Sequence, residues 1–184
     1  MSSEERMKIV DRTMGLLKQS SNPSSVTTRA IAECAEINPA MVNYYFGSKD
    51  ALMKEAVRGL FETTERDRLI SQSNPRKAMF DLLEDMCARI LSNKRYSPLY
   101  VPDSILNDRM SAPPGLVELI RDYFQGRVGD GECRATAYQM ASFLRIAAYR
   151  PEEFLLCSGI DMRNRGDLRR VISHQLDLFL RDSL

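Results

Sequence analysis

The chain has 184 residues with 26 Lys or Arg and 25 Asp or Glu, which gives a formal net charge of +1 at neutral pH. A nearly neutral protein does not bind nucleic acid through bulk charge, so any DNA affinity must come from a few placed contacts and from two copies acting together. No apolar run reaches the roughly 18 residues of a membrane span, and the N-terminus is charged where a signal peptide would be apolar. We therefore expect a cytoplasmic protein with no membrane partner.

Residues that could perform catalysis or hold a metal are sparse. The four cysteines, at positions 34, 87, 133 and 157, form no Cys-x-x-Cys pair, and the chain contains one histidine. We expect four reduced thiols in the core, no metal and no cofactor, while a cysteine that senses redox state or metal stays open. No nucleophile, base and orienting group can be assembled either, so the sequence predicts that the protein is not an enzyme.

The first predicted element is an amphipathic helix that runs to about Gln19 and opens with a capping box from Ser2 to Glu5. It ends in a polar loop that contains Pro23. We expect this helix to pack across the back of the two helices that follow it.

Two short helices come next, with a turn of about three residues between them. Thr27 is a good N-cap, and Ile31 and Ala35 recur behind it at helical spacing. Asn38 can cap the second helix, and Pro39 suits its first position, where no backbone N–H is needed. Two helices joined by so tight a turn cross at a steep angle, which predicts a helix-turn-helix.

The second of these helices has an outer face with no structural use. Four of its residues lie off the apolar inner stripe: Ala40, Met41, Asn43 and Tyr44. Base edges in a DNA major groove would cover an exposed amide and an exposed aromatic ring of this kind. Ser48 then caps a third helix, and its first residue, Lys49, would bind a phosphate together with the helix N-terminus.

This stretch resembles the DNA-binding domain of the TetR family of bacterial transcription regulators. The resemblance rests on Thr27-Thr28-Arg29, Ile31-Ala32, Ala35, Ile37, Val42 to Phe46 and Ser48 to Leu52. It implies that Thr28 and Arg29 touch the DNA backbone or a base, and that Tyr45 and Lys49 hold phosphates. The helix that opens at Asn38 would enter the groove with Pro39, Ala40, Met41, Asn43 and Tyr44.

The chain departs from the family pattern at Glu36, where the family often has glycine in the turn. A residue with a Cβ in a left-handed turn costs on the order of 1 kcal/mol. We interpret Glu36 as a tolerable strain or as a slightly different turn.

The rest of the chain is expected to be helical. One long helix should run from Lys49 to about Ile70, and another should start at Asn74-Pro75. Prolines at 98, 102, 113 and 114 should break the following stretch into short, loosely packed pieces around a cavity for a small apolar or aromatic ligand. Met and aromatic side chains at helical spacing are also typical of an ordinary hydrophobic core. The predicted lining is Met79, Phe80, Leu83, Met86, Tyr96, Tyr100, Met110, Tyr123 and Phe124.

Asp130 is expected to cap a helix that runs to about Tyr149, and a last helix should extend from about Asp167 to Arg181. Both carry apolar residues round more of their circumference than one core needs. They imply a second copy docked as a four-helix bundle, as the resemblance to TetR-family proteins also implies. The predicted interface is Tyr138, Ala141, Arg145, Ala148, Ile172, Gln175, Leu176 and Phe179.

The sequence thus predicts an all-α fold with a three-helix helix-turn-helix head over residues 1–48 and a helical effector-binding and dimerisation domain over residues 49–184. The predicted function is that of a DNA-binding transcription regulator, a TetR-like repressor released from a near-palindromic operator by a small-molecule effector of unknown identity. Activation in place of repression stays open. The alternative is a DNA-associated helix-turn-helix protein whose C-terminal domain binds a protein partner and no ligand.

Overall fold

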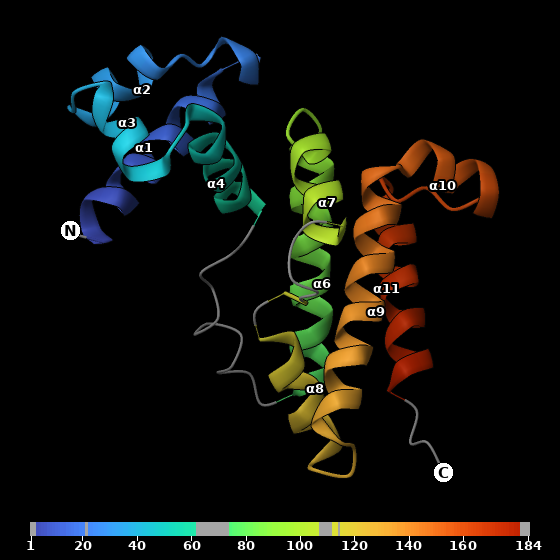
Figure 1. Ribbon diagram of the computed structural model, residues 1–184. Helices are drawn as coiled ribbons and strands as arrows, with labels where there is room; N and C mark the ends of the chain where they lie inside the picture. Colours follow the sequence, from blue (N-terminus) through green and yellow to red (C-terminus); the bar gives the residue numbers. More distant parts are fainter. Residues whose placement is uncertain (1–2, 21, 62–73, 107–111, 114, 181–184) are drawn as a thin grey trace.

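The computed structural model describes residues 3–20, 22–61, 74–106, 112–113 and 115–180. Within these ranges the regular structure is helical and contains no strand, so the predicted all-α class is confirmed. The elements, labelled in Figure 1, are α1 (Ser3–Gln19), a 3-10 helix η1 (Pro23–Ser25), α2 (Thr28–Ala35), α3 (Ala40–Phe46), α4 (Lys49–Phe61), α6 (Pro75–Ser92), α7 (Ser97–Leu106), α8 (Leu116–Phe124), α9 (Asp130–Tyr149), α10 (Pro151–Ser158) and α11 (Arg165–Phe179).

Helices α1 to α4 form the head. As the sequence predicts, α1 packs on α2, and it also packs along α4. The apolar side chains expected inside the helix-turn-helix are fully buried: Ile31, Ala35 and Val42. These side chains fix the crossing of α2 and α3, and they belong to an apolar cluster that continues into the body.

The remaining helices form the body, which is built around α6. This helix packs against α8, α9 and α11, and Figure 1 shows α9 and α11 side by side with α10 at one end of the pair. Met79 and Leu83 of α6 and Met140 and Leu144 of α9 have no exposed surface. Burying a side chain of this kind contributes about 1.5–3 kcal/mol each, so the α6–α9 contact is a main source of the body's stability.

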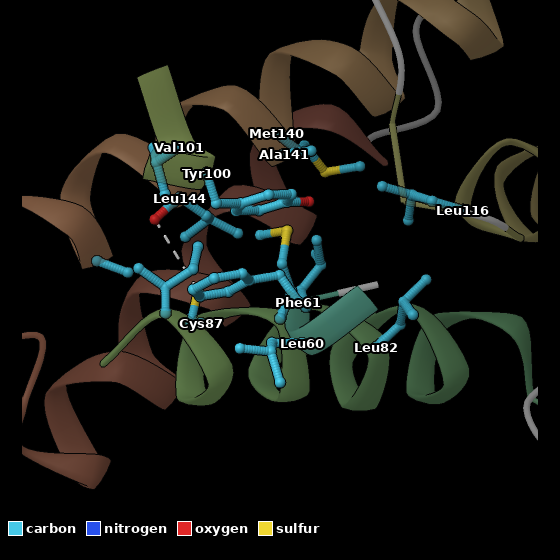
Figure 2. Packing of buried hydrophobic residues seen from close by; sticks show 14 of the residues in the cluster. Leu60, Phe61, Leu82, Cys87, Tyr100, Val101, Leu116, Met140, Ala141 and Leu144 are labelled. Carbon is cyan, nitrogen blue, oxygen red and sulfur yellow. Dashed lines mark hydrogen bonds between the residues drawn. The ribbon is translucent and has the colours of Figure 1, made fainter. Parts of the chain in front are cut away.

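The segment 95–103, at the start of α7, joins the body to the head. The hydroxyl of Tyr96 donates a hydrogen bond to the backbone carbonyl of Leu17, at the end of α1. The ring of Phe61, the last residue of α4, stacks on Tyr100 with 4.4 Å between ring centroids and 4° between ring planes. Figure 2 shows these two rings lying parallel within the apolar core, so both α1 and α4 end on the body.

The order of helices in the body differs from the prediction in two places. Residues 97–106 form one helix, although prolines at 98 and 102 predict a break. Pro98 lies in the first turn, where no backbone N–H is needed, and Pro102 removes a single hydrogen bond. Helix α10 was not expected, and Pro151 opens it from the first helical position. The predicted continuation of α4 from Phe61 to Ile70 lies outside the described residues.

The start of α9 also corrects the prediction that Asp130 is its cap. The cap is Gly129, whose backbone N–H donates to the Glu132 carboxylate at 3.0 Å. The Asp130 carboxylate instead pairs with the guanidinium groups of Arg121 and Arg134. A side chain held by two arginines is not available to cap its own helix.

In the part of the chain that the structure describes, no helix is long and apolar enough to cross a membrane. The same residues contain no group of three or more His, Cys, Asp or Glu side chains that could hold a metal ion. The site with the most distinctive geometry is the head.

Candidate nucleic-acid interface

Local hydrogen bonds set the ends of α2 and the start of α3 as the sequence predicts. The Thr27 hydroxyl accepts the Ala30 N–H at 3.1 Å, and the Asn38 side-chain oxygen accepts the Ala40 N–H at 2.9 Å. Between them, Glu36 adopts the left-handed conformation, with φ 60° and ψ 43°. The strained turn foreseen at Glu36 is therefore present, and it reverses the chain within a few residues.

The outer face of α3 is exposed. The Tyr44 side chain is 62% exposed, and the residues that accompany it on the surface are Asn38, Pro39, Ala40 and Asn43. Met41 is half-buried. In the first turn of α2, Arg29 is exposed and Thr28 is half-buried. Side chains with hydrogen-bonding and aromatic groups thus project from the short helix whose inner residue Val42 is buried.

The two residues expected to hold phosphates have partners inside the head. The hydroxyl of Tyr45 donates to the carboxylate of Glu5, in the first turns of α1. That hydrogen bond is the main reason that the pKa of Tyr45 is raised above its usual value, with burial and the charge of Glu5 as smaller causes. The Lys49 ammonium group, half-buried, donates to the backbone carbonyl of Val26 at 3.3 Å. The Tyr45 hydroxyl must release Glu5 before it can donate to a phosphate, whereas the Lys49 ammonium group has further hydrogens to donate while it keeps Val26.

The start of α1 is held to α3 and α4 by Arg6. Its guanidinium group donates two hydrogen bonds to Glu55 of α4, at 2.5 and 2.6 Å, and lies 4.7 Å from the centroid of the Phe46 ring at the end of α3. Bidentate arginine pairs with this geometry are among the stronger surface interactions. The sequence predicts a capping box for neighbouring Glu5 and gives no sign of the Arg6 contacts, because nothing local in the sequence shows that α1 begins beside α3.

The family comparison covers this region. Residues 9–56 match the model of the bacterial regulatory proteins of the tetR family, a range that runs from α1 through α2 and α3 into α4. The matched residues carry both helices of the helix-turn-helix and their caps. The head of this chain is therefore similar to the head of the tetR-family regulators.

Known transcription regulators are similar to this chain over a comparable length. One is the HTH-type transcriptional regulator BetI of Paraburkholderia phymatum, 32% identical over 80 residues, which are 41% of this chain and 40% of that protein. The BetI regulators of Burkholderia cenocepacia and Paraburkholderia phytofirmans are each 29% identical over 83 residues, 43% of this chain and 42% of theirs. The matched part thus spans about two fifths of the length of the curated relatives. These proteins are named as transcriptional regulators and not as enzymes.

The described residues of the predicted ligand pocket lie in several parts of the body. Met79, Leu83, Met86 and Phe124 are buried in the core. Phe80 is half-buried, and the guanidinium group of Arg169 lies 4.7 Å from the centroid of its ring. Met110 lies outside the described residues.

The three tyrosines predicted for the pocket have other contacts. Tyr96 and Tyr100 form the junction between head and body described above. The hydroxyl of Tyr123 donates to the backbone carbonyl of Leu180 at 3.2 Å. A groove of about 660 Å³ lies between α1, α4 and α7, and Tyr100 lines it together with Arg6, Val10, Ala51, Lys54, Glu55, Arg58, Gly59, Leu99 and Asp103.

Five of the eight residues predicted for the dimer interface lie in the core of the single chain: Ala141, Arg145, Ala148, Ile172 and Leu176. The prediction was wrong about these five, because α9 and α11 turn those side chains towards the other helices of their own body. Tyr138, Gln175 and Phe179 are half-buried. The apolar side chains that face outwards are Phe143 and Ile146 of α9 and Leu178 of α11, which are 39%, 48% and 45% exposed.

Proposed function

We propose that this chain is a DNA-binding transcription regulator that acts as a homodimer in the cytoplasm. In this proposal it is a TetR-like repressor, and a small-molecule effector bound in the body releases it from a near-palindromic operator. The residues that contact the DNA in this proposal are Thr28, Arg29, Asn38, Pro39, Ala40, Met41, Asn43, Tyr44, Tyr45 and Lys49. In this proposal the effector domain begins at residue 49. Helix α4 therefore packs on the other head helices but moves with the effector domain.

The observation that carries the proposal is the exposed outer face of α3. Tyr44 is 62% exposed and Asn43 is exposed beside it, on a helix of seven residues whose inner side packs on the head. Asparagine and tyrosine side chains can hydrogen-bond to base edges, and a helix fits into the major groove. A helix-turn-helix with this surface uncovered has a DNA duplex as its natural partner.

The exposed apolar residues of α9 and α11 support the homodimer. Phe143, Ile146 and Leu178 project from two helices that lie side by side. A two-fold interface between two such pairs would bury them. Two heads would then reach successive major grooves on one face of the duplex, about 34 Å apart.

The junction of α4 with the body supports the response to an effector. Because Phe61 at the end of α4 stacks on Tyr100 of α7, a change in the body can move α4 and with it Lys49 at the other end of the helix. A ligand changes DNA affinity only if it binds two arrangements of the body with different affinities. The proposed effector is therefore a ligand that prefers the arrangement in which the two heads do not fit the operator.

The experiment that tests the proposal is selection of bound fragments from a random pool of duplex DNA by the purified protein. We expect enrichment of a near-palindromic sequence. Retention of no particular sequence would contradict the proposal. The selected fragment is then titrated in the presence of pools of metabolites, with thermal unfolding of the protein as a second readout of ligand binding.

The alternative regulator, whose body binds a protein and no ligand, predicts a different result. No metabolite pool would then change the DNA affinity or raise the melting temperature. A defined second protein would instead copurify with the chain in a fixed ratio.

A further inference from the structure

The contact between Glu5 and Tyr45 joins two helices at the edge of the proposed DNA-binding surface. Glu5 lies in the first turns of α1 and is exposed, and Tyr45 lies near the end of α3. The phenol hydroxyl donates its hydrogen to the Glu5 carboxylate. A hydroxyl has one hydrogen to donate, so Tyr45 cannot hold this carboxylate and donate to a second anion at the same time.

The surroundings keep the two groups in place. The next residue, Arg6, is fixed by Glu55 and by the ring of Phe46, as described above. On the other side, the ring of Tyr44 meets that of Tyr45 edge to face, with 5.3 Å between centroids and 81° between planes. The Glu5 carboxylate is therefore held beside Tyr45. Tyr45 in turn contacts Tyr44, which is proposed to meet a base.

We propose that Glu5 competes with a DNA phosphate for the hydroxyl of Tyr45 and thereby limits the strength of DNA binding. The inference rests on the proposed function. A duplex that docks α3 brings its phosphates to the flanks of that helix, where they meet a carboxylate of the same charge. Glu5 thus opposes binding in two ways, by occupying the donor and by repelling the phosphate.

The charge of the head makes this competition consequential. Residues 1–60 contain eight Lys or Arg and seven Asp or Glu, so the head carries a net charge of only +1. Non-specific binding to DNA depends on the few cations that neutralise phosphates. One carboxylate placed at a phosphate contact therefore reduces affinity for all sequences, and it increases the share of the affinity that base contacts must supply.

The test uses the full chain and a random-sequence duplex of about 30 base pairs, long enough for two half-sites, because a phosphate contact does not depend on sequence. We expect Glu5→Ala to bind about three- to tenfold more tightly than the wild type, as for the loss of one repulsive charge at the rim of an interface. Asp11→Ala is the matched control, since Asp11 is also exposed on α1 and its replacement changes the net charge equally. It should change the affinity less than twofold. Glu5→Gln removes the charge but keeps an acceptor for the hydroxyl, so its affinity should fall between those of wild type and Glu5→Ala.

A double-mutant cycle separates competition from a purely structural role. In a Tyr45→Phe background there is no hydroxyl to release. The fold-gain in DNA affinity caused by Glu5→Ala should therefore be at most about half of the fold-gain in the wild-type background. Thermal unfolding should meanwhile show that Glu5→Ala does not stabilise the fold, because it loses a hydrogen bond.

Weaker or unchanged DNA binding by both Glu5 variants overturns the inference, as does an equal gain in both backgrounds. If the wild type and every variant retain no DNA, the proposed function itself fails. If the wild type binds DNA and Glu5→Ala binds no better than Asp11→Ala, only the role of Glu5 fails.

Discussion

At the scale of single residues, Tyr44 and Lys49 are expected to contribute to DNA binding in different ways. Tyr44 is exposed and positioned to meet a base, so Tyr44→Ala should weaken binding to the selected operator by about 1–3 kcal/mol and relax its sequence preference. Lys49→Ala should weaken binding to all sequences and reduce the slope of log Kobs against log salt concentration by about one. Titrations of operator and random duplex at several salt concentrations measure both effects. Unchanged retention of DNA by both variants would show that α3 is not the groove helix.

The four cysteines should differ sharply in reactivity. Cys157 is exposed, whereas Cys87 is fully buried, and burial raises its pKa to about 12 even though the nearby charge of Arg145 lowers it in part. Iodoacetamide at pH 8 should therefore modify Cys157 first and Cys87 only on unfolding, because the thiolate is the reactive form. Mass spectrometry of digests after timed labelling checks the order. Rapid labelling of Cys87 in the folded protein would contradict its placement.

The same thiol makes stability depend on pH in a defined direction. In the unfolded chain Cys87 ionises near its ordinary pKa of 9.0, and in the folded chain it ionises near 12. Its contribution is present in full below pH 9 and is lost as the pH rises from 9 towards 12. The free energy of urea unfolding should fall over this range more steeply for the wild type than for Cys87→Ala. Equal slopes in the two proteins would show that Cys87 is not buried as described.

At the scale of helices, the contact of Phe61 with Tyr100 is expected to hold the head to the body. Phe61 is 5% exposed, so Phe61→Ala should lower the free energy of unfolding by about 3–5 kcal/mol. Leu99→Ala is the control on α7, because Leu99 is 50% exposed and its truncation should cost less than about 0.5 kcal/mol. Urea denaturation of the three proteins gives the comparison. Similar stability for both variants would mean that the stacked rings contribute little.

Local signals predicted the starts of α2, α3 and α4 well, although they failed at the start of α9. Thr27, Asn38 and Ser48 each accept the expected backbone N–H, because a cap depends only on the residues within a turn of it. The prolines led to the prediction of a break where α7 is one helix. Proline disrupts a helix interior, but it is favoured in the first turn. The sequence alone does not show whether a given proline lies in the first turn of a helix or interrupts one.

The faces of α9 and α11 could not be assigned from the sequence for a different reason. Both helices are apolar round most of their circumference, so periodicity does not say which side meets α6 and which side faces outwards. Arg145 was predicted for the dimer interface, yet it is 5% exposed in the single chain and lies close enough to Cys87 to influence its pKa. Only the packing of the whole body decides such a position.

At the scale of the whole molecule, the proposed dimer predicts which substitutions separate the two copies. Ile146→Asp and Leu178→Asp place a charge on the exposed apolar face of α9 and α11, where the folded monomer tolerates it and a dry interface does not. We expect both variants to sediment as folded monomers and to lose affinity for a two-half-site operator. Leu156→Asp is the matched control, because Leu156 on α10 is 86% exposed and α10 lies at one end of the α9–α11 pair, so this variant should remain a dimer.

The buried core of the same helices provides the contrasting case. Leu176 has no exposed surface, so Leu176→Asp should unfold the chain instead of releasing a folded monomer, at a cost that circular dichroism would register as lost helix. Sedimentation equilibrium and circular dichroism together distinguish the two outcomes. If Ile146→Asp and Leu178→Asp remain dimers, the two copies meet elsewhere. The heads could then reach successive major grooves only through a contact outside the α9–α11 face, and the spacing expected for the operator would no longer follow from this structure.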